Sequence, residues 1–136
     1  MGSYAVLQTE GRVQAIVVRS GYKNKPVDFF TADDNELQMG MFTREAGHVV
    51  EPHYHGCTPF VIDSMQEFVL VKEGRVKLRL FTKAGKPTHK TVLETGDSVL
   101  LVEGGHSMEF LEKSTLLEVK QGPYEKNLKV FIGESN

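Results

Sequence analysis

The stretch Val76-Lys77-Leu78-Arg79-Leu80 alternates apolar and charged residues one by one. Its three apolar side chains therefore share one face of an extended chain, and its two cations share the other. This period of two is typical of a β-strand with one buried face. The stretch decides the fold class because the same pattern recurs along the sequence.

Similar segments follow one another at short intervals. We predict further strands at residues 13–18, 37–42, 67–71, 99–102, 108–111 and 116–119. Glycine-containing turn signals separate them, as at residues 83–87 and 94–97. No segment carries a sustained apolar stripe with helical spacing. The sequence therefore predicts an all-β fold with little helix, a sandwich or barrel of antiparallel strands.

Length and composition limit the possible functions. The 136 residues fit one domain, and 40% hydrophobic with 25% charged residues are typical of a globular protein. A formal charge of −2 offers no broad cationic surface for nucleic acid or anionic lipid. No apolar run approaches the roughly 20 residues of a membrane span. The single cysteine, Cys57, and the lack of a secretory signal favour a cytoplasmic protein.

One predicted strand is apolar on both faces. In Phe68-Val69-Leu70-Val71 neither alternate set is polar, so both faces should be covered. One face can point into the core. A second subunit packed back to back would cover the other, and so would an N-terminal strand folded over it. If a second subunit provides the cover, the protein is a homodimer, and we expect this arrangement.

Two histidines lie two positions apart in Pro52-His53-Tyr54-His55. An extended chain would point both imidazoles the same way. Such a pair by itself is a weak signal, because a polar strand end has the same pattern. The residues around it make the signal more specific.

Five residues with characteristic spacing form the first of two motifs. Gly47 lies six positions before His53, His55 follows, and Glu67 lies seven positions before Gly74. This arrangement resembles the first motif of the cupin family. Cupins are small double-stranded β-helix (jelly-roll) barrels. That motif reads glycine, five residues, His-x-His, a spacer, glutamate, six residues, glycine. The spacer here has eleven residues, longer than the usual three or four.

The second cupin motif also has counterparts, in the expected order. Gly96, Gly104 and His106 match its two glycines and its histidine. Val102 stands where proline is usual, and Phe110 stands in the asparagine position. The resemblance covers residues 37–120. It implies a single domain, 1–136, with N-terminal strands 1–36 and a C-terminal segment 121–136 packed on a cupin-type jelly-roll barrel.

The resemblance further implies a metal held by His53, His55, Glu67 and His106. Three imidazoles and one carboxylate suit one divalent transition metal ion, namely Fe, Mn, Ni, Cu or Zn. Burying four such groups without a cation would cost several kcal/mol. A metal-free polar pocket is the alternative.

Other residues fall near this predicted site. We expect five to line the pocket, with plain core packing as the alternative: Met39, Met41, Val69, Met108 and Phe110. The 56–66 insert is apolar for a turn, and we weigh it equally as a lid and as a strand extension packed on a partner subunit. Cys57 is either at the edge of the site or a loop thiol without a role.

The leading functional hypothesis is a metal-binding cupin that binds or acts on a small oxygen-bearing molecule, such as a sugar derivative or an oxo- or hydroxy-acid. An enzyme of this kind would be a metal-dependent dioxygenase or an isomerase or lyase. No dedicated catalytic base is visible, so the catalytic residues stay unassigned. The alternatives are a non-catalytic small-ligand or metal-binding module and a metal-independent sugar epimerase.

Overall fold

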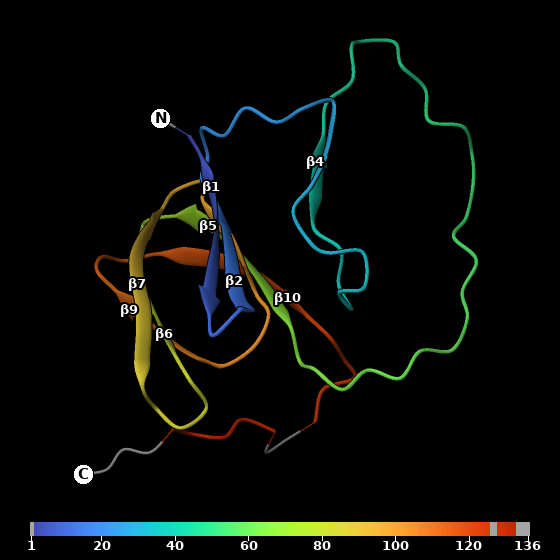
Figure 1. The fold of residues 1–136 in the computed structure, drawn as a ribbon. Helices are drawn as coiled ribbons and strands as arrows, with labels where there is room; N and C mark the ends of the chain where they lie inside the picture. The colour runs from blue at the N-terminus through green and yellow to red at the C-terminus, as the bar shows by residue number, and fades with distance from the viewer. Residues whose placement is uncertain (1, 126–127, 133–136) are drawn as a thin grey trace.

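The chain folds into two antiparallel β-sheets that face each other, with a short two-stranded ribbon beside them (Figure 1). The structure, a computed structural model, describes residues 2–125 and 128–132. Every strand pairing in these ranges is antiparallel and no helix occurs, which confirms the predicted all-β fold. A search of the same residues finds no helix long and apolar enough to cross a membrane.

The strands divide among three sheets. The five-stranded sheet contains, in spatial order, β1 (Tyr4–Thr9), β2 (Arg12–Val18), β8 (Ser98–Leu101), β5 (Glu67–Glu73) and β10 (Thr115–Lys120). The three-stranded sheet contains β7 (Pro87–Glu94), β6 (Arg75–Phe81) and β9 (Gly105–Phe110). The ribbon pairs β3 (Val27–Phe29) with β4 (Gly40–Phe42). Among the described residues no strand pairing joins the larger sheets into a closed barrel.

The core lies between the two larger sheets, where the alternating apolar residues meet. Val76, Leu78 and Leu80 of β6 are at most 1% exposed, as their period of two predicts. They pack in one cluster with Val69 and Val71 of β5. Burial of side chains of this size stabilises the fold by roughly 1.5–3 kcal/mol each.

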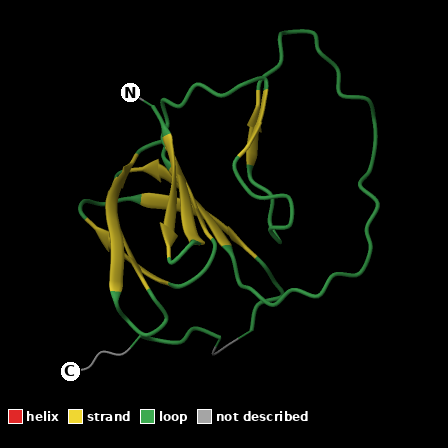
Figure 2. Ribbon diagram, viewed as in Figure 1, coloured by secondary structure: helices red, strands yellow, loops and turns green. Residues whose placement is uncertain are grey.

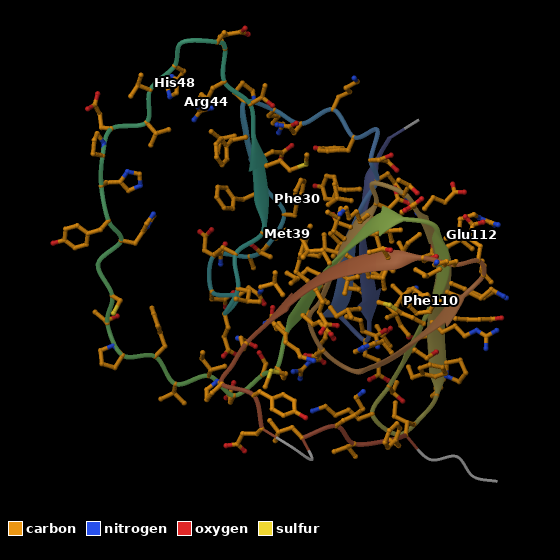
Figure 3. All side chains as sticks on the ribbon, turned by 180° about the vertical axis from the view of Figure 1, so that it is seen from behind. Phe30, Met39, Arg44, His48, Phe110 and Glu112 are labelled. Carbon is orange, nitrogen blue, oxygen red and sulfur yellow. The ribbon has the colours of Figure 1, made fainter. Side chains whose placement is uncertain are left out.

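The outer face of the five-stranded sheet is covered partly by the chain itself. Phe30 and Met39, which flank the ribbon, pack in a second cluster with Ile16, Leu100 and Phe68. Figure 3 shows Phe30 and Met39 between the β4 ribbon and the sheets. The second apolar face predicted for the 68–71 strand therefore has cover within the chain.

Some strands differ from the sequence-based prediction. The strand expected at 37–42 is paired only from Gly40, because residues 37–39 turn to place Leu37 and Met39 in the second cluster. Strand β7 is absent from the prediction because Thr88, His89 and Lys90 interrupt its apolar pattern. Its ladder with β6 determines its conformation instead.

Gly104 is one glycine whose lack of a side chain the fold requires. Its backbone φ is +84°, and a Cβ atom there would lie 2.7 Å from both the Gln14 amide nitrogen and the Phe81 carbonyl oxygen. The same Gln14 nitrogen donates a hydrogen bond to Phe81. The glycine of the second motif is thus explained by packing next to β9.

We expect Gly104→Ala to lower the free energy of unfolding by about 2–4 kcal/mol, because the left-handed backbone and the contact with Phe81 both oppose it. Gly11→Ala is the matched control: Gly11 has φ +75° but nothing within 4 Å of the added Cβ. Its expected cost is about 1–2 kcal/mol. Urea unfolding of both variants measures the difference, and equal losses would contradict this explanation.

Candidate functional site

Glu67 and His106 meet on the inner faces of opposite sheets. Glu67 opens β5 on the face that carries Val69, and His106 of β9 is paired with the buried Leu80 of β6. The His106 Nε2 atom lies 3.4 Å from the Glu67 Oε2 atom. The glutamate side chain is 16% exposed and the imidazole 38% exposed. Two of the four predicted ligands are therefore brought together by the packing of the sheets.

Two charged residues of the edge strand β10 extend this site. Lys120 is paired with Glu67 across the β5–β10 ladder, and Glu118 is paired with Val69. The Lys120 Nζ atom lies 3.2 Å from the Glu118 Oε2 atom. Neither Glu118 nor Lys120 was predicted from the sequence as part of the site. Leu116, Glu118 and Lys120 alternate along β10, and the pairing of Lys120 with Glu67 assigns all three to the face of Glu67.

The surroundings shift the protonation of these groups. Burial, together with the hydrogen bond to the neighbouring Glu118 carboxylate and its charge, raises the pKa of Glu67 to about 7. The hydrogen bond with Glu67 lowers the pKa of Glu118, and burial lowers the pKa of His106. Near neutral pH the site therefore combines a neutral imidazole with a carboxyl group close to its midpoint. Such groups can accept and donate protons, or bind a hydroxyl or carbonyl oxygen.

A small cavity of about 50 Å³ adjoins Glu67 and His106. Leu80 and Leu101 supply apolar parts of its wall, and Met65 lies at its rim. A space of this size holds only one or two water molecules or a few ligand atoms. Without a change in the surrounding chain, the site admits only part of a small molecule.

A larger and more open cavity, of about 270 Å³, lies beyond Gly104. Its wall includes Arg12, Lys83 and Gln14. The Gln14 carbonyl oxygen accepts hydrogen bonds from two threonine hydroxyls, and its amide nitrogen donates to a backbone carbonyl. All of these bonds hold strands together, so Gln14 is a structural residue.

The other two predicted ligands, His53 and His55, lie on the 43–66 loop between β4 and β5. Their ring centroids are 5.1 Å apart, so the two rings are neighbours, as their spacing predicts. The expected strand around them is not formed, and the loop arches away from the sheets (Figure 2). The His53 Nδ1 atom lies 2.7 Å from the Glu51 carbonyl oxygen.

The described residues of this one chain do not assemble the predicted metal centre. No three histidine, cysteine, aspartate or glutamate side chains in residues 2–125 and 128–132 converge so that they could hold a metal ion. Glu67 and His106 alone supply two donors, fewer than the three or four that protein metal sites use. In this conformation the residues present do not fit the metal, and the four-residue set stays a prediction.

The five predicted pocket residues divide between the space that separates the two large sheets and the ribbon on the outer side of the five-stranded sheet. Val69 is buried in the core, and Met108 packs against the same cluster. Phe110 follows on the His106 face of β9 and is 54% exposed. Met39 belongs to the outer cluster, and Met41 lies on the ribbon strand β4. Three of the five therefore lie on the side of Glu67 and His106, and the two ribbon methionines do not.

The 56–66 insert forms the second half of the 43–66 loop. Cys57 is exposed, and so are Phe60, Val61 and Ile62. At its end Gln66 is buried, and its backbone N–H donates to the Gln121 side chain. Near its end Met65 lines the small cavity, whereas the apolar residues 60–62 are exposed. The role of the insert as a lid or as a partner contact stays a prediction.

No family model, curated protein or solved structure matches this chain. The likeness to cupins therefore depends on the two sequence motifs.

The raised pKa of Glu67 predicts a pH effect on the metal-free protein. Because its ordinary value is 4.5 and the folded value is about 7, the folded state holds more protons than the unfolded state between these pH values. Glu67 therefore reduces stability as the pH rises through this window. We expect Glu67→Gln to gain stability relative to the wild type from pH 4.5 to pH 7.

Thermal unfolding across this pH range, in the presence of a chelator, measures the effect. Glu112→Gln, at an exposed position of the β9–β10 turn, is the control and should follow the wild type. Parallel curves for the wild type and Glu67→Gln would show that Glu67 does not titrate in this window.

Proposed function

We propose that the protein binds a small oxygen-bearing molecule, such as a sugar derivative or an oxo- or hydroxy-acid, at the inner face of a cupin-type jelly-roll barrel. We propose further that a divalent transition metal at Glu67 and His106 takes part in this binding. The observation that carries the proposal is the 3.4 Å contact between these two side chains. They come from separate motifs, and the fold of the core brings them together.

The site has the chemistry that such a ligand needs. A neutral imidazole and a carboxyl group can hydrogen-bond to hydroxyl and carbonyl oxygens, and Lys120 places a cation on the adjoining edge strand. The apolar walls at Leu80 and Leu101 exclude water from one side of the pair. Exclusion of water strengthens each polar contact inside the site.

A metal-free binding module is the second candidate. It is favoured by the observation that only two of the four predicted ligands meet in one chain. A metal-independent epimerase would need a tyrosine beside the histidine. The Tyr22 hydroxyl donates to Asp28, and Tyr54 is 91% exposed in the 43–66 loop, so neither is placed beside His106.

Metal titration of the purified protein separates these candidates. We expect the wild type to bind one Co²⁺ or Zn²⁺ per chain, and His106→Ala or Glu67→Gln to bind at least about tenfold more weakly. Loss of a ligand should cost no less than loss of an outer-shell partner, which typically costs 10–100-fold. Calorimetry together with elemental analysis provides the measurement.

His48→Ala is the matched control, since His48 lies on the same loop as the predicted histidine ligands but outside the His-x-His pair. It should bind metal as the wild type does. A folded wild type that takes up no metal, while a hydroxy-acid or sugar still raises its melting temperature, would contradict the metal proposal and support the metal-free module.

A further inference from the structure

The C-terminal segment 128–132 is packed against the body of the protein by the side chain of Ile132. This isoleucine is partly buried, whereas Leu128, Val130 and Phe131 are each more than half exposed. Figure 1 shows the segment, in red, passing the turn between β6 and β7. Ile132 is therefore the residue that fastens the segment to the sheets.

Two glycines make room for the Ile132 side chain. A Cβ atom at Gly85 would lie 2.8 Å from the Ile132 Cγ2 atom, and one at Gly105 would clash with the Ile132 Cδ1 atom. Phe81 is paired with Gly105 across the β6–β9 ladder, and its Cβ atom lies 3.6 Å from the same position. Gly85, Gly105 and Phe81 thus form a notch at the start of β9, which we call the Ile132 notch.

Gly105 is the informative member of this notch. Its φ lies outside the left-handed region, so its backbone suits any residue. Glycine weakens a strand, and in a strand it often marks a place where another group approaches closely. Among the described residues, the two atoms nearest to an added Cβ both belong to Ile132. The docked C-terminal segment therefore explains why residue 105 is a glycine.

Docking of Ile132 brings Lys129 to the Glu67–His106 pair. Gly105 immediately precedes His106, and the three residues from Lys129 to Ile132 span at most about 10 Å. Burial is the largest cause of the pKa shifts of Glu67 and His106, and the charge of Lys129 also acts on each pKa, in the lowering direction. In the described residues Lys129 forms no ion pair. The segment thus places a cation beside the site.

A cation at this place selects among the ligands of the proposed function. Lys120, the other cation near the pair, is already bonded to the Glu118 carboxylate. The cavity of about 50 Å³ beside Glu67 and His106 holds only a few atoms, so the rest of a bound molecule must lie outside it, near the surrounding charges. A carboxylate there would accept charge-assisted hydrogen bonds from an ammonium group. An oxo- or hydroxy-acid can provide this carboxylate, and a neutral sugar cannot.

We propose that residues 128–132 form a strap docked by Ile132 in its notch, and that the strap supplies Lys129 to bind the carboxylate of an oxo- or hydroxy-acid at Glu67 and His106. The ligand part of this inference rests on the proposed function. The docking of the strap does not, and its test needs neither metal nor ligand.

A designed disulfide tests the docking. The variant combines Gly105→Cys and Ile132→Cys in a Cys57→Ser background, and it is oxidised with diamide. The Ile132 Cγ1 atom lies 3.4 Å from the Cβ position of residue 105, so the two thiols can meet. We expect a disulfide within one chain, forming at least about tenfold faster than when Val130→Cys replaces Ile132→Cys. No disulfide, or equal rates for the two pairs, would overturn the docking.

Binding of small acids tests the role of Lys129. The probes are L-malate and 2-oxoglutarate, with glucose as the neutral probe, measured by calorimetry at low salt. We expect the wild type to bind an acid more tightly than glucose, and Lys129→Ala to bind that acid about three- to tenfold more weakly, as for one charge-assisted contact near the surface. Lys129→Arg should retain the binding. Lys113→Ala, at an exposed position of the β9–β10 turn, is the matched control and should bind as the wild type does.

A double-mutant cycle connects the anchor to the lysine. Gly105→Ala fills the Ile132 notch and should displace the strap, so it should weaken acid binding as much as Lys129→Ala does. The combined variant should bind no more weakly than either single variant, because both changes remove the same contact. Additive losses would overturn the link between docking and binding.

The outcomes separate this inference from the proposed function. A wild type that binds an acid as tightly as Lys129→Ala does, or that binds glucose alone, would overturn the role of Lys129 and leave the proposed function standing. A protein that forms the strap disulfide but binds neither the acids nor glucose would support the docking and overturn both the ligand role and the proposed function.

Discussion

The structure depends on the burial of one face of β5, β6 and β8 between the two large sheets. Val69, Val71, Leu78 and Leu80 are at most 1% exposed, and their alternation fixes which side of each strand faces inward. A shift of register by one residue would turn these side chains outward. The same alternation determines the positions of Glu67 and His106 on the inner faces. The packing of the core thus positions Glu67 and His106, which lie at its edge.

Much of the fold was predictable because its strands bury one face each. The 76–80 stretch forms the centre of β6, and the predicted strands at 13–18 and 116–119 lie within β2 and β10. The strands that were not predicted form for reasons other than the burial of one apolar face. Strand β1 is half exposed at the sheet edge, and β3 has only three residues. Their conformation comes from pairing with neighbours, which a local pattern does not encode.

Glu67 and His106 were predictable for the same reason, namely their place in strands with one buried face. Glu67 and His106 stand at the expected places because the residues after them alternate into the core. His53 and His55 have no such continuation, since the apolar residues around them, Val49, Val50 and Tyr54, are each more than half exposed. Glu118 and Lys120 were missed because charged residues on an edge strand ordinarily face solvent. Their role depends on the ladder with β5, which only the structure reveals.

The central claim is that the packing of the two large sheets brings Glu67 and His106 together into one site. A crystal structure of the Co²⁺-loaded protein, with anomalous data collected at the cobalt absorption edge, tests it most directly. The account predicts one anomalous peak per chain, within bonding distance of Glu67 and His106. A peak at any other place would contradict it.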